Sequence, residues 1–340
     1  MQLMSEPLVS VIVPTYNRAG IIGETIENIF QQTYPNIELI IVDDGSADST
    51  QSVLASYGQR IKWTTQPNAG PSAARNRGIA MAEGEIIALQ DSDDLWHPTK
   101  IERQVSLLER AGGSVVCCLC NTNIYSVDGS VMTSFDNAPI DPPYDEGIWT
   151  NVAEVLTTRF ILFNQAIAIR RTVLAKAGGF DENLKYLEDY QLGLRLALEG
   201  PWGFIRTPLV MQKQGTANSW SQGAFKEHTL IAEYNVSLRK DALRHLLSKG
   251  GDPALQALME KYLKQAQRVL RDLQTSRSDS LSQRFMGILR LQVERLRSAI
   301  GRRLPGYPTM KVEAIPAVPA GQTETPRDGG ARNFCESALR

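Results

Sequence analysis

The stretch that decides the fold is Val9-Ser-Val-Ile-Val-Pro14-Thr-Tyr-Asn-Arg18, a short β-branched run closed by proline and followed at once by polar side chains. Similar short apolar runs recur at 38–42, 61–65 and 85–89. Helix-length segments without strong breakers separate them, at 21–31, 46–56, 71–81 and 98–111. Because the strands are nearly continuously apolar and alternate with helices, they predict a parallel sheet covered by helices on both faces.

A fifth strand is expected around the sequence SVVCCLC, which contains Cys117, Cys118 and Cys120. Zinc sites need Cys pairs repeated at a distance, and the chain has only 3 His. We therefore interpret these cysteines as small buried apolar side chains. Four Cys in 340 residues exclude a disulfide scaffold, and reduced thiols are typical of a cytosolic protein.

The alternation stops after this strand, and the composition divides the rest of the chain. Residues 121–160 are rich in Asp, Pro, Asn and Gly and predict loops and short strands, whereas 164–170 predicts a strand and 186–198 a helix. We expect a catalytic domain over 1–223, with halves of about 1–120 and 121–223, and a helical extension over 224–304. Residues 305–340 lack periodicity and predict a disordered tail.

The overall charge excludes one class of partner. Lys and Arg number 36 against 37 Asp and Glu, and this balance argues against a dedicated nucleic-acid binder. The first residues, MQLMSEPLVS, show no signal peptide, and no apolar run reaches the roughly 18–20 residues of a membrane span. We therefore expect a cytoplasmic protein, either soluble or peripheral at the membrane.

Polar side chains gather where three of the predicted strands end, and two of these ends carry carboxylates. Thr15 to Arg18 follow the first strand, Asp43-Asp44-Gly45-Ser46 the second, and Asp91-Ser92-Asp93-Asp94 the run at 85–89. The carboxyl ends of parallel strands meet at one edge of a sheet, where open α/β sheets bind ligands. Five crowded carboxylates require a compensating cation, and Mg²⁺ or Mn²⁺ prefers such oxygen ligands. The alternative is that each cluster only forms a turn or caps a helix.

The segment Asn68-Ala-Gly-Pro-Ser-Ala-Ala-Arg75-Asn-Arg-Gly78 is a second candidate site. Pro71 suits the first turn of a helix, and Arg75 lies about one turn further on. A helix N-terminus with an arginine nearby favours an anion such as phosphate, although an arginine of this kind can also be merely solvated. No G-x-G-x-x-G follows the first strand and no P-loop motif occurs, which disfavours dinucleotide dehydrogenases and P-loop NTPases.

Taken in order, these motifs resemble family 2 glycosyltransferases, which have the GT-A fold. The matching elements are V-S-V-I-V-P-T-Y-N-R, V-D-D-G-S-x-D-x-T, N-x-G-x-x-x-A-R-N-x-G and D-S-D-D, followed by Gly178-Gly-Phe-Asp-Glu182 and Glu188-Asp189. The resemblance covers roughly residues 7 to 220. It implies a mostly parallel GT-A sheet flanked by helices, with the C-terminal helices as an extension.

The resemblance also implies a site for a nucleoside-diphosphate sugar. Thr15, Tyr16 and Asp43 would hold the nucleobase and ribose, and Arg75 would lie near the base or diphosphate. The residues expected to bind substrate are Pro14, Thr15, Tyr16, Asn17, Asp43, Asp44, Arg75, Asp91 and Glu188.

The same comparison implies where the metal and the base lie. Asp93 would bind Mg²⁺ or Mn²⁺, and Asp91 would contact the ribose or belong to the metal shell. Asp189 would be the general base on the acceptor hydroxyl, in a reaction that inverts the anomeric centre. A cation that stabilises the leaving diphosphate and one distant carboxylate suit a single displacement. A glycosidase would instead need two carboxyls flanking the bond.

One position departs from the family pattern. Many relatives carry a histidine after the last strand of the catalytic domain, whereas Gln214 stands here, and an amide is a poor metal ligand. The Q-x-x-R-W motif of processive polysaccharide synthases is absent, which favours transfer of single sugars.

The C-terminal stretch 264–303 carries ten Lys and Arg against three Asp and Glu, and Phe285, Leu289, Val293, Leu296 and Ile300 form an apolar stripe. Such a helix can lie on an anionic membrane, or it can pack on the catalytic domain or on a second protomer in a homodimer.

The sequence thus predicts a metal-dependent inverting glycosyltransferase that moves a sugar, with UDP as the expected nucleotide, to a glycan, lipid-linked or small acceptor. A nucleotidyltransferase and a non-catalytic sugar-nucleotide binding module remain alternatives. The first would need a Gly-rich basic loop after the first strand, and Thr15 to Gly20 fit that poorly.

Overall fold

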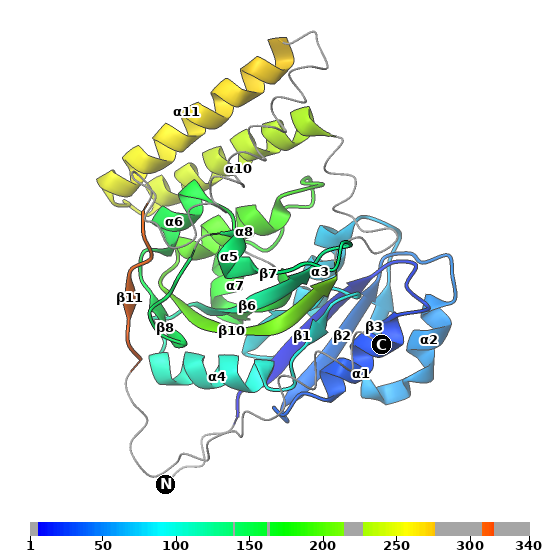
Figure 1. Ribbon diagram of the computed structural model, residues 1–340. Helices are drawn as coiled ribbons and strands as arrows, with labels where there is room; N and C mark the ends of the chain where they lie inside the picture. The colour runs from blue at the N-terminus through cyan, green and yellow to red at the C-terminus, as the bar shows by residue number, and fades with distance from the viewer. Residues whose placement is uncertain (1–5, 139, 162–163, 214–226, 276–307, 316–340) are drawn as a thin grey trace.

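The computed structural model describes residues 6–138, 140–161, 164–213, 227–275 and 308–315. The strands of these residues form one mixed sheet, drawn across the centre of Figure 1. Along the sheet the order is β11 (Val312–Glu313), β8 (Glu146–Trp149), β10 (Trp202–Lys213), β6 (Cys117–Tyr125), β9 (Ile167–Arg170), β4 (Ile86–Leu89), β1 (Val9–Thr15), β2 (Ile37–Asp43) and β3 (Lys62–Thr65). Two short strands lie beside this path: β5 (Leu95–Trp96) pairs with β10, and β7 (Val131–Thr133) pairs with β6.

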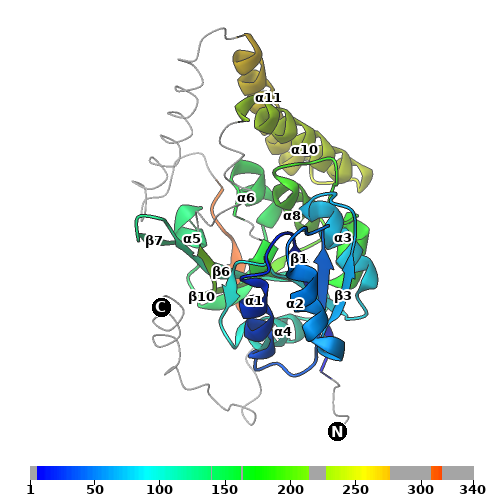
Figure 2. The same ribbon diagram turned by 90° about the vertical axis from the view of Figure 1, so that its right-hand side faces the viewer.

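The first half of the sheet follows the predicted pattern. β4, β1, β2 and β3 are parallel, and β9 then runs antiparallel between β4 and β6, so the sheet is mostly parallel but mixed. Helices α1 (Ile22–Phe30) and α4 (Lys100–Ala111) lie on one face, and α3 (Pro71–Met81) and α8 (Glu188–Ala197) lie on the other (Figure 1). Helix α2 (Thr50–Ser56) contacts α1, and Figure 2 shows the same layers from the side.

The core is the apolar interior of these strands. Val11, Ile12 and Ile40 are fully buried, as the continuous apolar runs predict. Cys117, Cys118 and Cys120 are buried free thiols in β6, so the interpretation of them as small core side chains is confirmed. Strands buried on both faces are what a parallel sheet with two helical layers requires.

Several boundaries differ from the sequence predictions. Helix α2 begins at Thr50 rather than at 46, because Ser46 bonds to the Asp43 carboxylate and keeps 43–46 as a loop. Helix α8 begins at Glu188, because Leu187 has a φ of +66° and cannot be helical. The 164–170 segment starts as a 3₁₀ turn over Asn164–Ala166. The segment 121–160 is more regular than predicted.

The second half of the predicted catalytic domain, 121–223, contains several short helices. Strand β6 extends to Tyr125, and helices α5 (Ser134–Asn137), α6 (Val152–Thr158) and α7 (Arg171–Ala177) follow it. Sequence periodicity missed α6 because a helix of two turns gives too few repeats to recognise.

The expectation of a structureless tail is wrong for residues 308–315. Strand β11 pairs antiparallel with β8, and the Asn151 side chain donates to the Thr309 carbonyl at 2.8 Å and accepts from the Lys311 N–H at 2.7 Å. The edge of β8 offers unpaired backbone groups that this segment satisfies. The local sequence pattern does not predict a strand pairing between segments so far apart in the chain.

Two long helices form the C-terminal extension. Helices α10 (His228–Ser248) and α11 (Pro253–Thr275) pack against each other, with α10 on α8 and α11 on α6 (Figures 1 and 2). The predicted helical character is confirmed over these residues. Within 264–303, residues 276–303 lie outside the described residues, as does Gln214. Among the described helices, none is both long and apolar enough to cross a membrane.

Candidate active site

The strand ends meet at one edge, as the sequence predicts. Thr15 stands opposite Asp43 in the β1–β2 register, and the Gln90 N–H donates to the Ile12 carbonyl, which aligns β4 with β1. Arg18, after β1, lies 3.4 Å from the Asp93 carboxylate after β4. The five aspartates therefore occupy one edge of the sheet.

Asp43 and Asp44 are buried, and their oxygens accept bonds from the chain itself. Asp43 accepts from Gln51 at 2.8 Å and from the Thr65 hydroxyl at 3.0 Å. Asp44 accepts from the Gln66 amide at 2.8 Å and from the N–H groups of Ala69 at 2.9 Å and Gly70 at 2.8 Å. Asp44 thus holds the loop that leads into α3, which is the turn role that the sequence left open.

The loop after β1 contains Asn17, which is fixed by hydrogen bonds, and Tyr16, which is exposed. Asn17 has a φ of +53°, its N–H donates to the Ser46 hydroxyl at 2.8 Å, and its side-chain oxygen accepts from the Ala47 N–H at 2.8 Å. Tyr16 beside it is 47% exposed, although large aromatic side chains are normally buried. Among the residues that the structure describes, the buried hydroxyl of Thr15 has no hydrogen-bond partner. Tyr16 and Thr15 are thus the groups of this loop suited to a planar, hydrogen-bonding ligand.

Arg75 connects the two halves of the site. Its Nη2 donates to Asp91 at 2.8 Å, and its Nη1 donates to Glu188 at 3.0 Å, with the guanidinium 5.3 Å from the Phe180 ring. Burial lowers the pKa of Arg75, but the carboxylates of Asp91 and Glu188 outweigh it and the net shift is upward. The guanidinium is therefore a permanent cation fixed between β4 and α8.

The neighbours of Arg75 explain the rest of its motif. Asn76 accepts from the Phe180 N–H and donates to the Phe180 carbonyl, both at 2.9 Å. Gly78 packs so closely on β1 that a Cβ would lie 2.4 Å from the Ile12 side chain. Asn76 belongs to the sequence motif around Arg75, but the motif alone does not indicate its role. Its partner lies 104 positions away, so only the fold could show it.

The residues after β4 are the candidate metal ligands. The side chains of Asp91 and Asp93 are 28% and 20% exposed, so they lie at the surface of the site. Burial raises the pKa of Asp94 well above its ordinary value, and the carboxylates of Asp91 and Asp93 raise it further. This repulsion among three carboxylates is what a bound cation relieves.

The donor set fits one kind of metal site. Within the described residues, no group of three His, Cys, Asp or Glu side chains forms a ready-made cage. Mg²⁺ and Mn²⁺ need none, since they often use one or two protein carboxylates and take their other ligands from phosphates and water. Asp91 and Asp93 match that arrangement.

The candidate base, Asp189, lies in the first turn of α8. Leu187 before it has a φ of +66°, a strained conformation for a leucine, and such strain concentrates at functional sites. Asp189 Oδ1 accepts from the Tyr190 N–H at 2.7 Å. Burial raises the pKa of Asp189 well above its ordinary value, and the adjacent Glu188 carboxylate raises it further. A carboxylate destabilised in this way is a better proton acceptor than an exposed one.

Known proteins are similar to this chain over part of its length. Residues 10–172 match the family model described as glycosyl transferase family 2. An uncharacterised glycosyltransferase of Rickettsia typhi is 34% identical over 186 residues, covering 55% of this chain and 57% of the relative. The Escherichia coli enzyme WfgD, named a UDP-Glc:alpha-D-GlcNAc-diphosphoundecaprenol beta-1,3-glucosyltransferase, is 42% identical over 107 residues, covering 31% of this chain and 42% of the relative.

Two solved structures share the fold. Staphylococcus aureus TarS in complex with UDP-GlcNAc matches with a TM-score of 0.57 at 19% identity, covering 80% of this chain and 74% of that one. The mannosyltransferase PcManGT of Pyrobaculum calidifontis, in complex with GDP-Man and Mn²⁺, matches with a TM-score of 0.52 at 22% identity, covering 88% and 84%. The chain spans 57% of the length of the Rickettsia typhi relative and 42% of the length of WfgD. Residues 10–172 thus match the model of glycosyl transferase family 2, and the sheet with its helices has the GT-A-type fold of these solved structures.

Proposed function

We propose that this protein is a metal-dependent inverting glycosyltransferase that moves a sugar from a nucleoside diphosphate, UDP in the first instance, to an acceptor hydroxyl. The observation that carries the proposal is the bridge made by Arg75, which joins Asp91 at the end of β4 to Glu188 beside Asp189. One arginine thereby holds the expected metal side and the expected base side of the reaction together.

The donor would lie along the edge of β1, β2 and β4. Tyr16 and Thr15 offer an exposed ring and an unpartnered hydroxyl for the base and ribose, beside Asp43. Asp91 and Asp93 would hold Mg²⁺ or Mn²⁺, which when bound stabilises the charge that grows on the departing diphosphate. The fixed cation of Arg75 lies beside Asp91 and adds to that stabilisation.

The acceptor would lie on the α8 side. Asp189 Oδ1 is engaged by the Tyr190 N–H, so Oδ2 takes the proton from the acceptor hydroxyl as its oxygen attacks the anomeric carbon. The bond to the diphosphate breaks on the opposite face, and the configuration inverts. The raised pKa of Asp189 suits this task, because a more basic carboxylate accepts the proton more readily.

The relatives support a nucleotide-sugar donor and leave its identity to experiment. TarS is described with UDP-GlcNAc, PcManGT with GDP-Man and Mn²⁺, and WfgD is named for a lipid-linked sugar acceptor. We therefore propose a glycan or lipid-linked acceptor for this chain as well, with a free sugar as the simplest substitute in an assay.

The test combines a binding panel with one variant. Thermal shifts with nucleoside diphosphates and sugar nucleotides, with and without Mn²⁺, identify the donor, and transfer is then measured with it. Asp189→Asn should leave the dissociation constant of the donor unchanged and lower kcat by about 10²–10⁴-fold, the usual contribution of a general base. Asp252→Asn, the same change in the exposed turn before α11, is the matched control.

A near-normal kcat of Asp189→Asn would show that Asp189 is not the general base. Release of pyrophosphate from a sugar phosphate and a nucleoside triphosphate would favour a nucleotidyltransferase. Tight UDP binding without transfer or donor hydrolysis would identify a non-catalytic binding module.

A further inference from the structure

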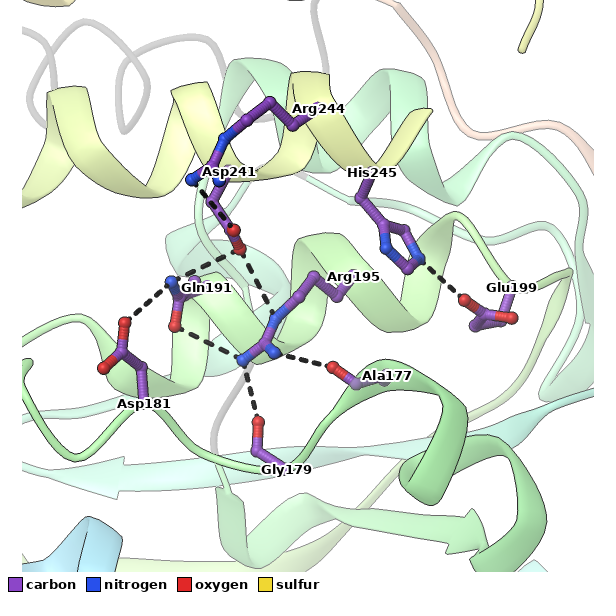
Figure 3. Close-up of polar contacts among 9 residues, drawn as sticks. All are labelled: Ala177, Gly179, Asp181, Gln191, Arg195, Glu199, Asp241, Arg244 and His245. Atoms are coloured by element: carbon purple, nitrogen blue, oxygen red, sulfur yellow. Dashed lines mark hydrogen bonds and ion pairs between the residues drawn. The ribbon is translucent and has the colours of Figure 1, made fainter. Parts of the chain in front are cut away.

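The helix that carries Asp189 is held from two opposite sides. On one side, Arg75 of α3 forms an ion pair with Glu188, the first residue of α8. From the C-terminal extension, α10 contacts α8 through a set of polar side chains (Figure 3). The family model ends at residue 172, so it includes neither α8 nor α10.

The first contact of α10 reaches the residue after the base. Arg239 Nη2 donates to the Tyr190 hydroxyl at 3.2 Å, and its Nη1 donates to the Thr157 carbonyl at 2.7 Å in the last turn of α6. The Tyr190 hydroxyl itself donates to the Leu156 carbonyl at 2.6 Å. The carbonyls at the end of a helix lack partners within it and attract a cation, so Arg239 and Tyr190 together attach α8 to the end of α6.

The second contact lies further along α8. Asp241 Oδ2 is 3.3 Å from the Gln191 amide and 3.7 Å from Arg195 Nε, and Figure 3 shows the three side chains pointing toward one another. Arg195 also donates to the carbonyls of Ala177 at 2.6 Å and Gly179 at 2.7 Å. Asp241 therefore contacts α8 directly and, through Arg195, is connected to the loop before α8.

This loop also contacts α3. Gly179 is close enough to α3 that a Cβ there would lie 2.9 Å from the Asn76 side chain, and Asn76 follows Arg75 directly. The segment 177–180 thus contacts two elements: α3, which carries Arg75, through Asn76, and α8 through Arg195. A shift of α10 would move α8 and this loop together, because both are attached to Arg195.

We propose that α10 positions the candidate base: Arg239 and Asp241 set the orientation of α8, and they are positioning residues for the transfer step. This inference rests on the proposed function of Asp189. Neither side chain touches the donor edge at β1, β2 and β4, so their loss should leave nucleotide binding intact. A displacement of about 1 Å at a reacting group can reduce the rate by roughly 10²-fold, so the effect on turnover should be large.

The experiment measures transfer and donor binding in the full chain. Arg239→Gln should lower kcat by about 10- to 100-fold with an unchanged dissociation constant for the donor. Arg239→Lys should recover part of the loss, because an ammonium is a point charge that cannot serve two acceptors as a planar guanidinium does. Lys240→Gln, next to Arg239 in the same helix but exposed, is the matched control and should behave as wild type.

A purely structural role of α10 predicts another pattern. It would lower the melting temperature, donor binding and kcat together, and that result would overturn the proposal, as would an Arg239→Gln variant with wild-type kcat. If Arg239→Gln does not fold, Asp241→Asn provides the test, since it keeps the shape and removes the charge facing Arg195. Wild-type kcat in Asp241→Asn would then refute the proposal.

The two hypotheses fail in distinguishable ways. If the wild-type protein binds donors but transfers no sugar, the proposed function is wrong. If the wild-type protein transfers sugar and the α10 variants match it, only the positioning role is wrong.

Discussion

Asp43 and Asp44 end β2, and Asp91 and Asp93 follow β4, so both pairs lie at the same edge of one sheet. The first pair is buried and accepts its bonds from neutral donors in α2, at the end of β3 and in the loop before α3. The second pair is partly exposed and faces arginines from other elements, Arg75 and Arg18.

This difference shows what each pair can do. Carboxylates saturated by amide and hydroxyl donors stabilise loops and need no cation. Carboxylates that depend on charged partners respond to any further ion that enters the site. The pair after β4 is therefore the one that we expect a divalent cation and a diphosphate to use.

The largest expected effect is on metal-dependent binding. Asp93→Ala should weaken Mn²⁺-dependent donor binding by about 100-fold or more, since even indirect supporters of a metal site contribute 10–100-fold. Calorimetric titration of UDP with Mn²⁺, and again with EDTA, measures this. Donor affinity that still depends on Mn²⁺ as in the wild type would show that Asp93 is not a ligand.

The next effect is on stability and tests the charged partner of the second pair. Arg75→Gln leaves Asp91 and Glu188 without their buried cation, and breaking such a pair costs about 3–5 kcal/mol. Urea unfolding should show this loss. Arg77→Gln, two residues along the same helix but exposed, should change the free energy of unfolding by less than about 0.5 kcal/mol. Equal stability of the two variants would contradict the bridging role of Arg75.

A smaller effect is expected for the first pair. Asp44→Asn replaces one acceptor oxygen by a donor that faces the loop N–H groups, and a buried group left unsatisfied costs about 1–3 kcal/mol. Unfolding in urea measures this loss, and UDP titration of the folded variant completes the comparison. Reduced UDP affinity at unchanged stability would mean that Asp44 contacts the nucleotide rather than the loop.

Much of the donor side could be predicted from sequence. The strands are continuous apolar runs, and the aspartates follow them directly, so their convergence on one edge follows from the parallel sheet alone. The partners of Arg75 could not be predicted, because Glu188 lies 113 positions away and no local pattern encodes that approach. The hydrogen bonds of Asp44 and Asn17 to nearby loops could not be predicted either. A loop aspartate or asparagine has the same sequence pattern whether it binds a ligand or the backbone of its own chain.

By itself the sequence determined the α/β class, the carboxyl edge and the residue types from which we expect a site for a cation and a diphosphate. These depend on chemistry within a few residues, such as apolar runs, turn residues and carboxylate spacing. Only the tertiary structure decided that Arg75 joins the two halves, that α10 supports the helix of Asp189, and that residues 308–315 complete the edge of β8. Those outcomes depend on contacts between distant segments, whose geometry exists only after the sheet and its helices have packed.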